Sequence, residues 1–208
     1  GFELANQFGD SASMIKSGRV AGQALRRLDR VQESIDILRQ VLPIAKRNRI
    51  TDEYKKILNS LAIAYTLKAQ YDKALEHNFE SLVLREGEGN KAEVSIALNN
   101  IGLVYFKLHN YEGALDYYTR SLRLKEEVRD TVDLDFLYLN LGLCYLHLKQ
   151  YKEAKIYTLK GLEICGSKCD DLVIISNKFG LGEASYWLKD YEDAEKHLNE
   201  SLKIARKT

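Results

Sequence analysis

Residues 91–130, KAEVSIALNNIGLVYFKLHNYEGALDYYTRSLRLKEEVRD, hold two apolar patterns separated by a short polar break at 109–110. Over residues 94–108 the apolar positions recur three and four residues apart, which is the spacing of one face of an α-helix. The same spacing resumes at the break and continues over residues 111–124. This stretch therefore predicts two antiparallel helices of about four turns each. Asn90 and Glu93, three residues apart, predict a capping box at the start of the first helix.

The pattern recurs every 40 residues along the chain. A tyrosine followed three residues later by an alanine marks each period, at Tyr71, Tyr111, Tyr151 and Tyr191. A small residue keeps the same step, at Gly22, Ala62, Gly102, Gly142 and Gly182. A fixed period of this size indicates a stack of like units rather than one globular core. Mid-helix glycine is costly, so we expect a partner helix to approach closely there, with alanines such as Ala114 and Ala154 as its matching small residues.

The register predicts one solenoid over residues 1–208. Its parts are the tail of a preceding repeat at 1–10 and five repeats at 11–50, 51–90, 91–130, 131–170 and 171–208. No polar capping helix follows the fifth repeat, although a terminal repeat normally needs one. We therefore expect the chain to be a fragment of a longer protein.

These residues carry a family resemblance. Ile101-Gly102-x-x-Tyr105, followed by Ala114 and Tyr118, resembles the tetratricopeptide repeat pattern, and variants of it recur in the other periods. The 40-residue period is longer than the usual one and resembles the repeats of kinesin light chain, of Leu-Gly-Asn adaptors and of bacterial signalling proteins. The resemblance implies an all-α, right-handed α-solenoid of antiparallel helix pairs, whose first helices line a concave groove.

Charge is abundant but balanced, with 31 Lys and Arg residues against 30 Asp and Glu residues. This balance argues against nucleic acid or a membrane surface as the partner. Residues 11–50 are an exception, with nine basic and three acidic residues. They form either a solvated basic face or a contact zone for an acidic partner, and the candidate contacts are Lys16, Arg19, Arg26 and Arg27.

Asparagines recur on the predicted groove face of the first helices. A side-chain amide both donates and accepts, so it can pair with a peptide backbone whatever the peptide's side chains are. The resemblance to kinesin light chain and Leu-Gly-Asn adaptors implies the same role. Alternatively, the amides bond neighbouring helix ends or water, and their apolar neighbours are partly buried between adjacent first helices. The predicted peptide-binding residues are Asn59, Ile63, Asn99, Asn100, Leu103, Phe106, Lys107, Asn140, Leu143 and His147.

Sequence signals for catalysis are absent. No Gly-rich phosphate loop, H-E-x-x-H or G-x-S-x-G string occurs. Cys144 occupies a core position of the repeat, and Cys165 with Cys169 lacks the spacing of common zinc sites. The three cysteines suggest no disulfide framework. We expect no catalytic residues, no metal site, no cofactor and no enzymatic activity.

The sequence therefore predicts a non-enzymatic protein–protein interaction module. It would bind an extended peptide or a partner helix in the groove, by backbone hydrogen bonds and apolar pockets. Self-association through uncapped ends is a further expectation, whereas nucleic-acid binding and direct membrane contact are not expected. The alternative is a sensory input region of a bacterial two-component histidine kinase or transcription regulator.

Overall fold

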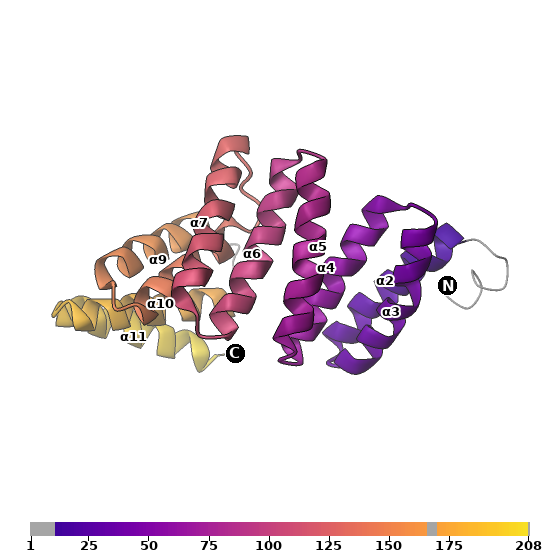
Figure 1. Ribbon diagram of the computed structural model, residues 1–208. Coiled ribbons are helices and arrows are strands. Elements are labelled where there is room, and N and C mark those ends of the chain that lie inside the picture. Colours follow the sequence, from indigo (N-terminus) through magenta and orange to yellow (C-terminus); the bar gives the residue numbers. More distant parts are fainter. Residues whose placement is uncertain (1–10, 166–169, 208) are drawn as a thin grey trace. The chain divides into compact units, whose positions relative to one another are not determined.

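Each 40-residue period folds into two helices joined by a tight turn (Figure 1). The structure, a computed structural model, describes residues 11–165 and 170–207, so the expectation for residues 1–10 lies outside the described residues. Every regular element in the described ranges is an α-helix, which confirms the expected all-α fold of antiparallel helix pairs. The helices are α2 (Ser11–Arg27), α3 (Val31–Arg47), α4 (Thr51–Leu67), α5 (Tyr71–Gly87), α6 (Lys91–Lys107), α7 (Tyr111–Val128), α8 (Leu134–His147), α9 (Tyr151–Cys165), α10 (Asp171–Trp187) and α11 (Tyr191–Ala205). We call α2, α4, α6, α8 and α10 the first helices and the others the second helices.

The turns between helices share one backbone device. A residue with left-handed φ recurs at twenty-residue intervals, and only Gly89 among these is a glycine. At Ala69 (φ 54°), the amide donates to the Thr66 carbonyl and the next amide, of Gln70, donates to the Tyr65 carbonyl at 2.9 Å. This pair of bonds closes the helix end, as in a Schellman motif. The remaining members of the series are Asp29, Arg49, His109, Arg129, Lys149 and Lys189.

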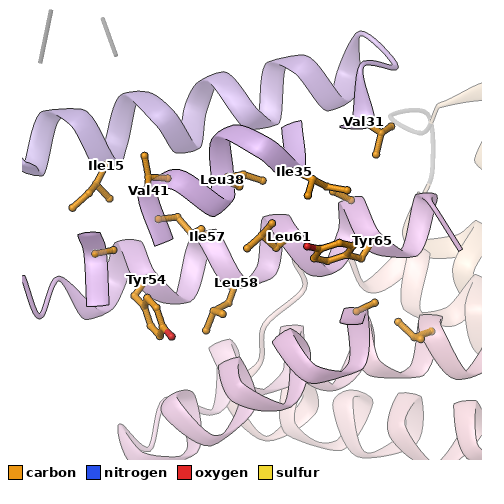
Figure 2. Packing of buried hydrophobic residues seen from close by; sticks show 14 residues of the cluster. Ile15, Val31, Ile35, Leu38, Val41, Tyr54, Ile57, Leu58, Leu61 and Tyr65 are labelled. Carbon is orange, nitrogen blue, oxygen red and sulfur yellow. The ribbon is translucent and has the colours of Figure 1, made fainter. Parts of the chain in front are cut away.

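Two compact units divide the chain between Val104 and Tyr105. In unit 1, which ends at Val104, α4 packs against α3, α5 and α2. Its core is mainly aliphatic. Leu38, Ile57 and Leu61 are fully buried, and Figure 2 shows them packed together. Such a core stabilises the unit mainly by removing apolar surface from water.

In unit 2, which begins at Tyr105, α8 packs on α7, α9 and α10. Its main core cluster includes Leu137, Leu141 and Cys144. Cys144 is buried and free, as expected for a core cysteine, and burial raises the pKa of its thiol to about 12. The sequence suggests no disulfide framework, yet Cys165 is disulfide-bonded.

In three first helices the small position faces a side chain of the following second helix: Gly22 faces Leu38, Gly142 faces Thr158 and Gly182 faces Leu198. A Cβ built at Gly142 would lie 2.4 Å from Thr158 Oγ1, and one built at Gly22 would lie 2.7 Å from Leu38 Cγ. The expected close approach of the two helices is therefore present. However, the partner of Gly142 is mainly Thr158, one turn beyond the expected Ala154, whose carbonyl oxygen lies 3.5 Å away. The glycine makes room for a side chain rather than for another small residue.

Tyr118 of α7 is fully buried, and among the described residues its hydroxyl has no hydrogen-bond partner. Burial accordingly raises the pKa of Tyr118 above its usual value. A buried hydroxyl without a partner loses its hydrogen bonds to water and gains none in return. We expect Tyr118→Phe to keep the ring packing and to raise the free energy of unfolding by about 1 kcal/mol. Urea denaturation followed by circular dichroism measures this change, and a loss of stability would show that the hydroxyl has an unrecognised partner.

Candidate functional site

A polar cleft opens in unit 1 beside the first helices. Its volume is about 300 Å³, and helices α2, α4, α5 and α6 all contribute to its walls. Almost every lining side chain is polar or charged, with Ile96 as the apolar exception. The lining residues are Gln23, Asp52, Lys55, Lys56, Asn59, Arg85, Glu93 and Ile96.

Lys55 forms the base of this cleft. Its side chain is 3% exposed, and its ammonium pairs with Glu88, with Glu93 at 3.2 Å and with Asp52 at 3.3 Å. Burial alone would lower the pKa of Lys55, but hydrogen bonds to the three carboxylates outweigh burial and raise it. Lys55 therefore remains charged at neutral pH and ties α4 to the α5–α6 connection.

Arg85 is the second buried cation of the cleft. Its Nη1 donates to Glu93 Oε2 at 3.1 Å, and its Nε donates to Ser81 Oγ at 3.0 Å. Burial lowers the pKa of Arg85 from its usual value, and the charge of Glu93 opposes this shift. Glu93 thus lies between Lys55 and Arg85 and neutralises part of both charges. Its backbone amide donates to Asn90 Oδ1 at 3.3 Å, which confirms the cap, but its carboxylate serves the cations instead of completing the expected capping box.

The charges around the cleft cancel. Arg19 Nε pairs with Glu53 Oε2 at 2.6 Å, and Lys56 pairs with the other oxygen of Glu53 at 3.5 Å. Together with the groups described above, four cations face four carboxylates: Arg19, Lys55, Lys56 and Arg85 against Asp52, Glu53, Glu88 and Glu93. A cleft with this balance favours a neutral hydrogen-bonding ligand over a phosphate or another free anion.

Two of the predicted asparagines of unit 1 form a hydrogen bond with each other. Asn100 Nδ2 donates to Asn59 Oδ1 across neighbouring first helices, and Gln23 donates similarly to Ser60 Oγ at 3.3 Å. Each amide offers up to four hydrogen bonds, so the Nδ2 group of Asn59 and Oδ1 of Asn100 keep free capacity. Asn99 differs, because its Oδ1 is buried and has no partner. Ile63 and Leu103, the predicted apolar neighbours, are both half-buried.

The predicted basic contacts fall into two groups. Arg19 is engaged by Glu53 and by Gln23, so it is not a free charge. Lys16 and Arg27 are exposed, and Arg26 is half-buried with its Nε lacking a hydrogen-bond partner. The role of these residues in binding an acidic partner stays a prediction.

In unit 2, Asn140 of α8 differs from the asparagines of unit 1. It is half-buried, and its amide makes no hydrogen bond within the described residues. Leu143 is half-buried beside it, and Phe136 on the same helix is 46% exposed. A free amide among apolar side chains can pair with one backbone group of a bound segment while neighbouring pockets hold its side chains.

Two aromatic clusters lie in unit 2 near the ends of its first helices. His147 stacks on Tyr111 with ring centroids 4.3 Å apart, and Phe106 meets both rings edge-on. The predicted residues Phe106 and His147 are thus brought together, whereas Lys107 is exposed and forms no ion pair within residues 11–165 and 170–207. We call these three rings the first aromatic cluster.

The second aromatic cluster comprises Tyr151, Tyr186, Trp187 and Tyr191. Trp187 stacks on Tyr151 at 5.7 Å and meets Tyr186 edge-on at 5.6 Å, while Tyr186 contacts Tyr191 at 5.8 Å. Tyr186, Trp187 and Tyr191 are each more than half exposed. Exposed aromatic rings of this kind are enriched at protein interfaces.

Sequence reasoning missed Lys55 and Arg85 as lining residues. Charged side chains are rarely buried unless they are paired, so a helix pattern assigns them to solvent. The repeat register gives one indication that position 85 is buried. It is equivalent to positions 45, 125 and 165 in the other repeats, and Ala45, Arg85, Lys125 and Cys165 are all buried. Lys125 repeats the device in unit 2, where its ammonium pairs with Asp130 at 2.7 Å and donates to the Val132 carbonyl.

Two negative findings apply to the described part of the chain. It holds no group of three or more histidine, cysteine, aspartate or glutamate side chains arranged to bind a metal ion. None of its helices combines the length and apolar character that crossing a membrane requires.

Comparison with known proteins identifies the repeats. Residues 93–167, from the first turn of α6 to the end of α9, match the family model for the tetratricopeptide repeat. Residues 93–167 thus carry the tetratricopeptide repeat signature. The resemblance carried by Gly102, Tyr105 and Ala114 is thereby confirmed. None of the curated protein sequences is significantly similar to the chain.

Solved structures with the same fold include other repeat proteins. BtubC (BKLC) from P. vanneervenii superposes with a TM-score of 0.84 at 20% identity, over 99% of this chain and 87% of that one. A signal transduction ATPase with numerous domains from Pyrococcus horikoshii, which has a tetratricopeptide repeat sensor, gives 0.82 at 19% identity, over 100% and 32% of the chains. Aspartyl phosphate phosphatase F from Bacillus subtilis gives 0.75 at 16% identity, over 94% and 61%. At these identities the likeness concerns the fold alone.

Proposed function

We propose that this tetratricopeptide repeat protein is a protein-interaction module that holds an extended peptide or a partner's helix against its first helices. The observation that supports this function best is the polar cleft of unit 1, whose charged side chains are balanced by their ion-pair partners and whose wall includes the amides of Gln23 and Asn59. Its volume of about 300 Å³ suits a short stretch of peptide rather than a large cofactor.

The chemistry of the cleft fits a peptide backbone. A peptide group is neutral and carries one donor and one acceptor, and the free capacity of Asn59 and Asn100 offers both. Ile96, which is 40% exposed at the cleft, gives an adjacent apolar contact. In unit 2, Asn140 with Leu143 and Phe136 offers the same combination. Binding of this kind depends on backbone hydrogen bonds for affinity and on pockets for specificity.

A peptide selection tests the proposal. Peptides selected from a random phage-displayed library on the whole chain would be titrated by calorimetry against the wild type and the Asn59→Ala/Asn140→Ala variant. We expect the variant to bind about tenfold more weakly, because the candidate site in each unit loses an amide contact, with little change in thermal stability. Asn199→Ala is the matched control, since Asn199 is an exposed asparagine of α11. Failure to select any peptide, or equal affinity in the double variant, would contradict the proposal.

The alternative, a sensory input region, has one supporting observation. The repeats of the Pyrococcus horikoshii ATPase carry the description of a sensor, and they share this fold. In a sensor the bound segment would change the activity of an attached effector, whereas in a scaffold binding is the whole function. A kinase or transcription-regulator module encoded in the same gene would favour sensing over scaffolding.

A further inference from the structure

An unpaired carboxylate lies on α10 among exposed aromatic rings. Glu183 is half-buried, and within the described residues its carboxylate has neither an ion-pair nor a hydrogen-bond partner. Phe179, Tyr186 and Trp187 stand four residues before, three after and four after it, so all lie on one face of the helix. Each of the three rings is slightly more than half exposed. We call Phe179, Glu183, Tyr186 and Trp187 the α10 face.

The partial burial of Glu183 indicates that its carboxylate needs a cation or a hydrogen-bond donor as a partner. A carboxylate that loses part of its hydration is destabilised unless a cation or a hydrogen-bond donor replaces the water. Other half-buried carboxylates of unit 2 have such partners: Asp193 pairs with Lys155 at 2.7 Å, and Glu200 pairs with Lys178. Glu183 is the exception on a face that is otherwise apolar, and a cationic group from outside the described residues would complement it.

Within the described residues, helices α8 and α10 supply no free lysine or arginine of their own. Lys178 is the one lysine or arginine within α8 and α10, and Glu200 occupies it. The nearby Lys155 of α9 is held by Asp190 and Asp193. The charge of Glu183 is therefore uncompensated by these side chains, so the α10 face favours a positively charged partner.

Trp187 makes arginine a better complement than lysine. A guanidinium is planar, stacks on aromatic faces and donates two parallel hydrogen bonds to a carboxylate, whereas an ammonium is a compact and strongly hydrated point charge. Tyr151 and Tyr186 brace the indole, and 55% of Trp187 remains exposed for such stacking. Glu183 and Trp187 lie one helical turn apart, which allows one guanidinium to contact both.

We propose that the α10 face binds an arginine side chain of a partner protein segment, with the guanidinium paired to Glu183 and stacked on Trp187. The proposal rests on the proposed function, since it names the chemistry of a bound segment. Apolar residues beside that arginine would contact Phe179 and Tyr186. The partner is thus a basic and apolar segment, in contrast to the acidic partner that the sequence suggests for α2.

Trp187 is the sole tryptophan of the chain, so its fluorescence can report binding at the α10 face. The ligands would be a synthetic peptide with one arginine between apolar residues and its counterpart with citrulline, which has nearly the same shape without the charge. We expect the arginine peptide to change the emission of Trp187 on titration and to bind about tenfold more tightly than the citrulline peptide. Added salt should weaken the binding of the arginine peptide more than that of the citrulline peptide.

Matched variants assign the effect to the carboxylate. In Glu183→Gln, which keeps the side-chain shape, the preference for arginine over citrulline should disappear. Glu192→Gln removes an exposed carboxylate from α11 and should preserve the preference. Trp187→Phe should weaken the binding of the arginine peptide about threefold to tenfold. Calorimetry measures this variant, because the tryptophan fluorescence is lost. Circular dichroism of each variant checks that the fold is retained.

The outcomes separate this inference from the proposed function. Equal binding of arginine and citrulline peptides, or an arginine preference that survives Glu183→Gln, overturns the arginine assignment. If Asn140→Ala then still weakens both peptides, the surface binds segments through its amide and the proposed function stands. If neither peptide binds, the arginine assignment is overturned, and the library selection on the wild type decides the proposed function separately.

Discussion

Gly142→Ala is expected to lower the free energy of unfolding by about 1–3 kcal/mol, the usual cost of an added group in a packed core. In a solvent-exposed helix the same exchange would raise stability by about 1 kcal/mol, because alanine is the better helix former. The sign reverses here because the new methyl would lie 2.4 Å from Thr158 Oγ1. Urea denaturation of the whole chain, followed by circular dichroism, measures the change.

A second substitution distinguishes this clash from a general loss of packing. Thr158→Ala removes the hydroxyl that the new methyl would meet, at the cost of its hydrogen bond to the Ala154 carbonyl at 2.7 Å. The double variant should therefore be more stable than Gly142→Ala alone. Gly87→Ala is the control, since no atom lies within 4 Å of its added Cβ, and it should be neutral or slightly stabilising. A stable Gly142→Ala variant would show that α8 and α9 separate without cost.

The repeat period allowed most of the fold to be predicted, because helix pairs in register need only their apolar spacing to be recognised. The turns are instructive in this respect. Ala69 adopts a left-handed φ of 54° that alanine does not favour, so local turn chemistry would not have located this turn. The 40-residue register located the breaks instead, from the positions of neighbouring repeats.

The repeat period could not predict which side chains of different helices contact each other. Asn59 and Asn100 are 41 residues apart, and their hydrogen bond depends on the rotation of one first helix against the next. The sequence placed both on one face but could not show that they meet each other. Similarly, the pattern singled out Gly142 as a close approach, yet only the structure identifies Thr158 as the side chain that fills it.

Lys55→Met should lower the free energy of unfolding by about 2–3 kcal/mol. Removing one member of a fully buried ion pair typically costs about 3–5 kcal/mol, because the remaining charge is left without compensation. The loss here is smaller, because Glu88 and Glu93 are 41% and 34% exposed and Arg85 still faces Glu93. Methionine fills the volume of the aliphatic stem, so the change isolates the ammonium.

The neighbouring lysine provides the control. Lys56 is 54% exposed and pairs with Glu53 at 3.5 Å, so Lys56→Met should change stability by less than about 1 kcal/mol. The carboxylates raise the pKa of Lys55, so its stabilising contribution is fully present below the ordinary lysine pKa of about 10.4 and is lost as the pH rises through the folded-state value. The stability difference between wild type and Lys55→Met should therefore be constant around neutral pH and should shrink in strongly alkaline solution. Equal stability of Lys55→Met and Lys56→Met at neutral pH would mean that the ion cluster merely offsets its own desolvation. The cleft would then owe its shape to the aliphatic packing of unit 1 rather than to Lys55.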